Sequence, residues 1–293
     1  MNRYEFALYV AENTGFTAEQ IERIKPVMQL ILEKAEDKIA ALEEALAKHE
    51  DKEQMLFDIA KYVGIDEHLG ELAITLLITQ KSHEIFMEKG ISERVFLDSM
   101  KNIRVWTETY IDGNSERFGM REYGYVHYNL RADILRHGRL EFQHGHFESD
   151  DYEIDGHIIK KGSPVIFTHI PADGPFPPEA VEESFRLAYQ YYKLDKLTPF
   201  VTHSWLIHPA VKKFCKPESN MAKFCDCFHY LYHEDQEKWW DLWRVFGGGA
   251  SCDYLTLLPE KTSLQRNVKA YLLEGGKLGE AYGVLLHDGE KRL

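Results

Sequence analysis

The residue pattern of this chain changes near His137-Gly138, and that change limits the folds available to it. Before this point apolar residues recur at helical spacing, and no stretch alternates convincingly between apolar and polar residues. After it, short alternating or β-branched stretches come between helical ones. The pattern predicts an α+β chain, with an all-helical N-terminal domain over residues 1–137 and a mixed α/β domain over residues 138–293.

The first half carries local signals for where helices begin and end. Thr17-Ala-Glu-Gln20 has the form of a capping box, which starts a helix, and Pro26 should interrupt or restart that helix. Gly64 is expected to end another helix. Apolar spacing predicts helices over residues 27–48, 52–63, 66–87, 92–110 and 120–136.

The second half is predicted to form a sheet with helices between its strands. Thr262 or Ser263 should cap a late helix that ends at Gly275-Gly276, and other helices should end near residues 192 and 246. Strands are expected over residues 139–147, 158–159, 165–170, 199–207, 224–232, 254–258 and 281–287.

Charge and composition exclude several classes of partner. The net charge of −13 argues against nucleic acid or an anionic membrane as the main partner, because both require a basic face. No apolar run approaches the roughly 20 residues of a membrane span, and the first residues lack the apolar core of a signal peptide, so a cytoplasmic location is expected. The four cysteines are few for this length and are expected to be reduced, with Cys225 and Cys227 buried in a strand.

The segment from Val165 to Tyr192 runs from a predicted strand through a proline-rich loop over 171–178 into a helix. The N-terminus of such a helix presents free N–H groups that can receive a phosphate. Three acids in its first turns, Glu179, Glu182 and Glu183, would instead satisfy the helix dipole and repel an anion. The residues therefore allow either a phosphate site or an ordinary strand-to-helix connection.

Polar groups gather at three predicted strand ends: Thr168-His169, the run from Thr202 to Trp205, and Ser219-Asn220. If the strands carrying His169 and His203 are neighbours, as sequential strands usually are, these ends open onto one cleft. A histidine there either acts as a base or is structural. Ser204 lacks the G-x-S-x-G context of a serine hydrolase.

Two patterns suggest metal ligands. His144-Gly-His146 places two rings on one face of a strand, and Cys225-x-Cys227 precedes His229 and His233. The first pair has no third ligand at a telling distance, and structural zinc sites usually use a wider cysteine spacing. Solvent-facing histidines and buried thiols are the preferred interpretation of both.

Several short segments look familiar as a set. They are Gly138-Arg139 before Leu140-Glu-Phe142, His169-Ile-Pro171 with Gly174-Pro175 and Ser184-Phe185, His203-Ser-Trp-Leu206 with Pro209, and Ser219-Asn220 followed by Phe224. In this order and spacing they resemble a bacterial family of two-domain acyltransferases, in which a helical N-acyltransferase N-terminal domain precedes a GNAT-like C-terminal domain.

The resemblance implies an acyl-CoA site where two central strands splay apart. Residues 165–170 would be one of those strands, and the loop over 171–178 would lie on the cofactor side. The residues that would bind the cofactor are Ile170, Pro171, Gly174, Pro175 and Ser184, and those that would bind the substrate are Trp205 and Asn220.

The implied chemistry is direct attack of an amine on the thioester, without a covalent enzyme intermediate. His203 is the preferred base and His169 the second choice, while Ser204 or Tyr230 would protonate the thiolate. The acceptor would be an amine of a small molecule or peptide, the expected donor is acetyl-CoA, and no metal is expected.

Two other functions remain open. The acidic loop favours a catalytically inactive GNAT-like protein that binds or senses a ligand. A His-ligated metal enzyme would use His144, His146 and His169.

Overall fold

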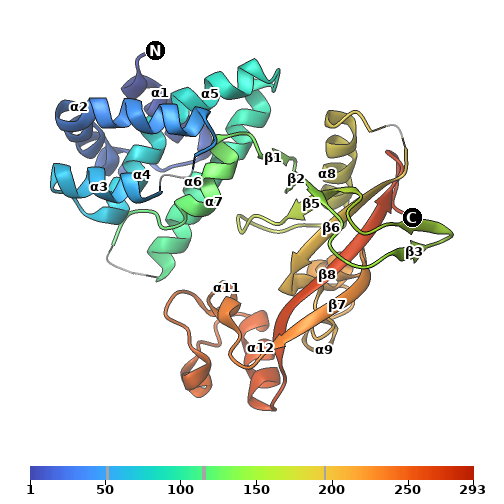
Figure 1. The fold of residues 1–293 in the computed structure, drawn as a ribbon. Coiled ribbons are helices and arrows are strands. Elements are labelled where there is room, and N and C mark those ends of the chain that lie inside the picture. Colours follow the sequence, from blue (N-terminus) through green and yellow to red (C-terminus); the bar gives the residue numbers. More distant parts are fainter. Residues whose placement is uncertain (51–52, 114–116, 195) are drawn as a thin grey trace. The chain divides into compact units, whose positions relative to one another are not determined.

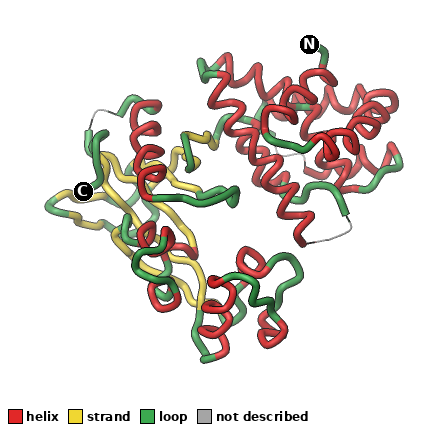
Figure 2. The backbone as a smooth tube through the Cα atoms, turned by 180° about the vertical axis from the view of Figure 1, so that it is seen from behind, coloured by secondary structure: helices red, strands yellow, loops and turns green. Residues whose placement is uncertain are grey.

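The computed structural model describes residues 1–50, 53–113, 117–194 and 196–293. The chain divides into two compact units, Met1–Arg136 and His137–Leu293. The first unit is made of helices, and the second combines a sheet with helices and loops (Figures 1 and 2). The predicted α+β architecture therefore agrees with the observed order of elements.

The helices of the first unit pack around a core of aliphatic and aromatic side chains. The second of them begins as predicted, because the Gln20 N–H donates to Thr17 Oγ1 at 3.2 Å and the Thr17 N–H donates to Gln20 Oε1 at 2.8 Å. The helices are α1 (Arg3–Thr14), α2 (Ala18–Ala47), α3 (Glu53–Val63), α4 (Glu67–Leu77), α5 (Thr79–Glu88), α6 (Glu93–Gly113) and α7 (Tyr123–Leu130).

Three predictions for this unit are wrong. α2 continues through Pro26, because Ile24 and Met28 on either side are fully buried and packing outweighs the loss of one helical hydrogen bond; its non-helical residue is Ala35. The expected helix over 66–87 is two helices that meet at Ile78. The expected helix over 120–136 ends at Leu130, and two residues later Ala132 adopts a φ of 58° that a helix cannot accommodate.

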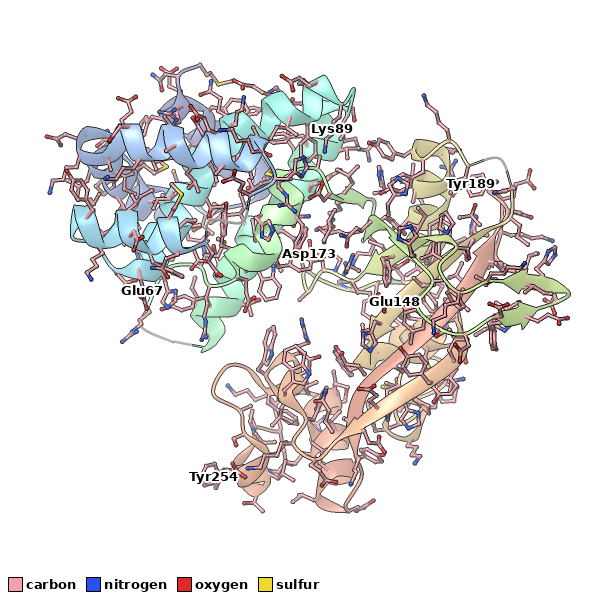
Figure 3. The ribbon with its side chains drawn as sticks, in the orientation of Figure 1. Glu67, Lys89, Glu148, Asp173, Tyr189 and Tyr254 are labelled. Atoms are coloured by element: carbon pink, nitrogen blue, oxygen red, sulfur yellow. The ribbon has the colours of Figure 1, made fainter. Side chains whose placement is uncertain are left out.

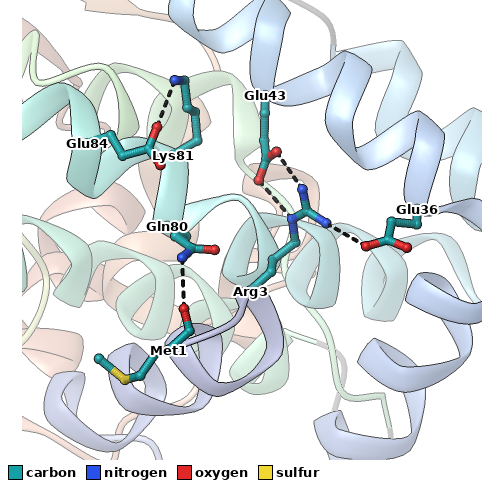
Figure 4. Close-up of polar contacts among 7 residues, drawn as sticks. All are labelled: Met1, Arg3, Glu36, Glu43, Gln80, Lys81 and Glu84. Carbon is teal, nitrogen blue, oxygen red and sulfur yellow. Dashed lines mark hydrogen bonds and ion pairs between the residues drawn. The ribbon is translucent and has the colours of Figure 1, made fainter.

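Polar contacts tie the first helix to its neighbours (Figure 4). Arg3 on α1 donates to both carboxylate oxygens of Glu43 on α2, at 2.9 and 2.7 Å, and its third contact is Glu36 at 3.4 Å. Gln80 on α5 donates to the Met1 carbonyl at 3.1 Å.

None of the helices in the described part of the chain is long and apolar enough to cross a membrane.

The sheet has six strands in the order β1-β2-β5-β6-β8-β7. β5 and β6 are parallel, whereas β2 with β5, β6 with β8 and β7 with β8 are antiparallel. A separate two-stranded hairpin is made of β3 and β4. The strands are β1 (Ile134–His137), β2 (Leu140–His146), β3 (Tyr152–Ile154), β4 (His157–Ile159), β5 (Pro164–His169), β6 (Thr198–Ser204), β7 (His229–Gln236) and β8 (Leu278–His287).

The two faces of this sheet are covered by different elements. Phe142, Phe185 and Phe200 belong to a large core under the helices, and we call that side the helix face. Val201 and Tyr282 belong to a smaller core with residues of the β3–β4 hairpin, and we call that side the hairpin face. The helices of the second unit are α8 (Pro178–Tyr191), α9 (Val211–Phe214), α10 (Asn220–Cys225), α11 (Trp243–Phe246) and α12 (Ser263–Leu273), with 3-10 turns η1 (Trp205–Ile207), η2 (Trp240–Leu242) and η3 (Cys252–Leu257).

Several boundaries of the second unit were predicted wrongly. The expected strand over 224–232 begins only at His229, because Ser219 caps α10 by accepting from the Ala222 N–H at 3.2 Å. The expected helix over 235–246 starts as the end of β7, and the expected strand over 254–258 is η3. Cys225 and Cys227 are free and buried as predicted, although neither lies in a strand.

Candidate active site

The parallel strands β5 and β6 separate at their C-terminal ends. Within the described ranges their backbone pairing stops at Phe167–Val201, although β5 continues to His169 and β6 to Ser204. The last link is made by a side chain, because the Thr202 hydroxyl donates to the Thr168 carbonyl at 2.9 Å. His169 and His203 do lie on neighbouring strands, as the sequence predicted.

Arg139 organises the loop that follows β5. Its guanidinium donates to the carbonyls of Pro171 and Gly174 at 2.7 Å each and to the Pro175 carbonyl at 2.9 Å. It also lies 3.3 Å from the carboxylate of Asp173, which Figure 3 labels on this loop. Proline lacks an N–H group, so this loop has few backbone donors for its own carbonyl groups. Arg139, in the turn that precedes β2, supplies the donors.

The acids at the start of α8 are neutralised by basic side chains. Glu182 accepts from His287 at 3.1 Å and from Arg292 at 2.9 Å, and the hydrogen bond from His287 is the main reason that the pKa of Glu182 is lowered. Glu183 pairs with Arg186 at 2.6 Å. Two of the three charges expected to repel an anion therefore already have cationic partners.

Two cavities flank α10 on the helix face. One, of about 370 Å³, lies at the start of α8 and is lined by Phe176, Pro178, Val181, Asn220, Lys223, Phe224, Asp226, Cys227 and Arg292. The other, of about 240 Å³, is mostly apolar and is lined by Ile207, Pro209, Lys212, Cys225, Phe228 and Tyr230. The first cavity is therefore lined in part by polar and charged groups, whereas the second is an apolar space next to the Tyr230 side chain.

The two predicted bases lie on the hairpin face. His203, opposite Tyr282, keeps 44% of its side chain exposed, and its Nε2 lies 3.5 Å from Glu280, whose pKa is raised mainly by burial. His169 contacts the Gln143 side chain at 3.2 Å, and burial lowers its pKa to about 4. The accessible ring beside a carboxylate is therefore His203, and His169 stays neutral at ordinary pH.

A second set of polar groups lies on the helix face at β7. A register shift between Tyr230 and Tyr232 leaves Leu231 as a bulge, so that Tyr230, His233 and Asp235 share one side of the strand. The Tyr230 hydroxyl hydrogen-bonds to His233 Nδ1, and His233 Nε2 lies 3.8 Å from Asp235. His208 Nε2 is 3.1 Å from the same carboxylate. Of these four residues, only Tyr230 was singled out from the sequence for this chemistry.

The other predicted site residues have mainly structural contacts. Ser184 is buried; its hydroxyl donates to the Ala180 carbonyl and accepts from the Arg139 N–H at 2.8 Å. Ser204 accepts from the Leu206 N–H, and Trp205 packs edge-on against Trp239. Asn220, expected ahead of a strand, instead begins α10 and lines the larger cavity.

The alternative metal site at His144, His146 and His169 does not form. His144 and His146 lie on the same side of β2 as Phe142, and the His144 ring packs against Tyr192. His169 contacts Gln143, which alternates to the opposite side. Among the described residues, a cluster that could hold a metal consists of His208, His233 and Asp235.

Comparison with known proteins shows to which family this architecture belongs. A family model described as the GNAT-like C-terminal domain matches residues 134–285, just over half of the chain. The chain belongs to this family. The expected helical region followed by a GNAT-like C-terminal domain is thereby confirmed. No curated protein matches the chain by sequence.

Solved acyltransferase structures share the fold of nearly the whole chain. One, in complex with decanoyl-CoA and teicoplanin, has a TM-score of 0.72 at 19% identity and covers 96% of this chain and 87% of its own. A mutant acyltransferase in complex with octanoyl-CoA has a TM-score of 0.70 at 18% identity, with coverage of 96% and 87%. A third, in complex with CoA and 10C-teicoplanin, has a TM-score of 0.71 at 18% identity, with coverage of 95% and 86%.

Proposed function

We propose that this GNAT-like protein is an acyl-CoA-dependent N-acyltransferase that moves an acyl group directly to an amine of a small molecule or peptide. The observation that carries the proposal is the end of β5–β6 pairing at Phe167–Val201, which leaves strand N–H groups between the two strands for a ligand and for a developing oxyanion. We assign acyl transfer to residues 138–293 and treat residues 1–137 as the helical N-terminal domain of the same enzyme.

The charged cavity supports binding of CoA phosphates. Lys223 and Arg292 line it beside the first turn of α8, and the Arg139-held loop, with Ile170, Pro171, Gly174 and Pro175, borders the same turn. Lys223 next to a helix N-terminus favours a diphosphate, although Asp226 lines the same cavity and Arg292 also pairs with Glu182 at 2.9 Å. Solved acyltransferases of this fold are in complex with decanoyl-CoA and teicoplanin or with CoA and 10C-teicoplanin; both complexes support the choice of donor and acceptor classes.

The sheet carries a candidate base on the hairpin face of β6 and a candidate acid on the helix face of β7, with β8 between the two strands. His203, beside Glu280, takes the proton from the attacking amine, with His169 as the second candidate. Tyr230, or otherwise Ser204, protonates the departing thiolate. The nitrogen–carbon bond forms as the carbon–sulfur bond breaks, so the protein needs no covalent intermediate. Trp205 and Asn220 remain our candidates for contact with the acceptor.

Calorimetry and a thiol assay test this function together. Titration with octanoyl-CoA or acetyl-CoA should release or absorb heat with one site per chain. Mixing the same donors with benzylamine, glucosamine or triglycine should release free CoA thiol at a rate that depends on the amine. Heat without thiol release would favour the inactive ligand-binding protein. Neither heat nor a thermal shift with any acyl-CoA would contradict the proposal.

A further inference from the structure

The hairpin face around His203 carries acidic and aromatic side chains from three neighbouring strands. His203 on β6 pairs with Tyr282 on β8, and Tyr282 pairs with Tyr232 on β7. Two residues along the same strands, Glu280 on β8 stands directly opposite Glu234 on β7. Because side chains two residues apart on a strand share a face, all five lie on the same side of the sheet. The candidate base therefore stands beside a patch of carboxylates and rings.

Resting on the acyl transfer proposed above, we propose that this patch binds the amine-bearing part of the acceptor, and that the acceptor is a diamine or polyamine whose second ammonium group lies against Glu234 and Tyr232. The nitrogen that is acylated faces His203 and gives up its proton there, whereas the second nitrogen keeps its charge. We call His203, Tyr232, Glu234, Glu280 and Tyr282 the acceptor patch.

The carboxylates of the acceptor patch are short of neutralising cations. Like charges directly opposite each other in a sheet destabilise it, and Glu234 and Glu280 are such a pair. Glu234 is exposed, and among the described residues no basic side chain forms an ion pair with it. Glu280 has His203 at 3.5 Å, while Arg244, which also acts on Glu280, already contacts Asp241 at 2.6 Å. A cationic ligand relieves this repulsion, and a neutral ligand does not.

Aromatic rings give the acceptor patch a surface that suits a cation. Tyr232 is 39% exposed and stacks on Tyr282 with ring centroids 5.6 Å apart, and the His203 ring meets Tyr282 edge-on at 6.1 Å. The face of an aromatic ring attracts ammonium groups. The pKa of Tyr232 is raised by burial and then by Glu148 and Glu234, so two carboxylates act on this ring. Ring and carboxylates thus favour the same class of ligand.

The Tyr282 hydroxyl is a separate observation that points to a ligand on this face. Tyr282 is buried, and its hydroxyl has no hydrogen-bond partner of ordinary geometry within the described ranges. Burial raises the pKa of Tyr282 to about 12, and the backbone of Glu148 acts in the opposite direction. A buried phenol oxygen without a donor can accept from the N–H of a ligand, and an ammonium group supplies such a donor.

The spacing of the strands sets the length of the acceptor. Neighbouring strands lie about 4.8 Å apart, so His203 on β6 and Tyr232 on β7, with β8 between them, are about 10 Å apart across the sheet. A six-carbon chain joins two nitrogens over about this distance. The probe is therefore 1,6-diaminohexane, with hexylamine as the matched amine that lacks the second charge and 6-aminohexanoic acid as the one that reverses it.

The three amines are compared by kcat/KM, measured as thiol release from octanoyl-CoA. We expect 1,6-diaminohexane to exceed hexylamine about 10-fold at low salt, and hexylamine to exceed 6-aminohexanoic acid. The difference should lie in KM for the amine, with kcat within about twofold, because the second ammonium group takes no part in the chemical step. In about 0.5 M NaCl the preference should shrink to about threefold, since salt screens exposed charges.

Substitutions in the acceptor patch should change the ratio of kcat/KM for 1,6-diaminohexane to that for hexylamine. Glu234→Gln and Tyr232→Leu should each lower this ratio to about threefold, and Glu234→Lys should lower it to about one. The ratio is taken within each variant, so a general loss of active protein cancels. Glu153→Gln is the matched control, because Glu153 is exposed on β3 and its substitution changes the net charge equally; its ratio should stay at about 10-fold.

Three results would overturn the acceptor assignment while leaving acyl transfer in place. They are equal kcat/KM values for the three amines, a preference for 6-aminohexanoic acid, or a ratio in Glu234→Lys as high as that in Glu153→Gln. Failure of the function itself looks different: the unchanged protein would then release no thiol with any amine, and the acceptor assignment would fall with it.

Discussion

The two faces of the sheet carry histidine and carboxylate groups in contrasting settings. On the hairpin face, His203 is 44% exposed and meets Glu280 at 3.5 Å. On the helix face, His208 is buried and fixed by the Ala210 N–H and Asp235, and Tyr230 stands between this cluster and a cavity. Tyr230, His233 and Asp235 are exposed much as His203 is, so the two faces differ in the contacts that fix the helix-face groups and not in access to water. This difference suggests a base on one face and an acid on the other.

Removal of His203 should give the largest effect. We expect His203→Ala to lower kcat/KM about 100-fold, which is typical of a lost general base. His229→Ala is the matched control, because His229 pairs with Val284 and so lies on the same face of the sheet, on β7 beyond β8. Acyl transfer that is unchanged across pH in His203→Ala would remove this residue from the mechanism and leave the helix face as the only source of proton transfer.

Arg139 should affect the helix face through the loop. Its side chain is only 10% exposed and holds three carbonyls and Asp173. We expect Arg139→Ala to lower the free energy of unfolding by about 2 kcal/mol and to raise KM for octanoyl-CoA, since hydrogen bonds to a charged group are lost. Arg186→Ala, which removes an exposed pair on α8, should have a much smaller effect than Arg139→Ala in urea unfolding. Equal losses of unfolding free energy in the two variants would contradict the role of Arg139 in organising the loop.

Substitution of Lys223 tests the binding of the CoA phosphates separately from the chemical step. Lys223→Glu should weaken octanoyl-CoA binding about 10-fold in calorimetry, because it places a negative charge in the cavity with Arg292. Binding of octanoyl-pantetheine, which lacks the phosphates, should be unaffected. Lys216→Glu changes the same charge outside the two cavities and serves as the control. A similar weakening by both variants would show only a long-range charge effect.

Protonation of His169 should destabilise the folded protein, whereas protonation of a histidine with an acidic partner stabilises it. Burial lowers its pKa to about 4, below the value of about 6.5 in an unfolded chain. Between these values the unfolded chain binds a proton that the folded protein does not, so stability falls as pH falls. From about pH 7.5 to about pH 5.5 the loss should be about 1 kcal/mol.

His169→Gln should remove that pH-dependent loss while leaving acyl transfer largely intact. Urea unfolding at the two pH values measures the first expectation. A rate loss as large as that of His203→Ala would instead make His169 the base and reverse the order of the two candidates on the hairpin face.

Local signals in the sequence predicted the parts of the fold that depend on neighbours along the chain. The capping box at Thr17 is where the sequence places it, Thr262 is the one of the two predicted caps that begins the late helix, and the strand carrying His169 does lie beside the strand carrying His203. The prediction of a helix break at Pro26 was wrong because the free energy that a proline costs locally is smaller than the free energy gained by packing the buried residues around it.

The helix-face cluster could not be predicted in the same way. Period-two alternation puts Tyr230 and His233 on opposite faces, and only the bulge at Leu231 reverses this. His208 comes from a distant turn and reaches Asp235 through the fold. Arg139 was visible in the sequence, yet its role depends on the loop 32 to 36 residues later. These contacts follow from tertiary structure, which residue patterns do not encode locally.

Hydrogen exchange at the two strand ends tests most directly whether acyl-CoA binds where β5 and β6 separate. Their amides beyond Phe167 and Val201 lack pairing with each other, so a ligand between them should protect them. Octanoyl-CoA should slow exchange in peptides covering residues 168–176 and 202–207 and leave peptides of α1 to α5 unchanged. Binding by calorimetry without slower exchange at both strand ends would contradict the account.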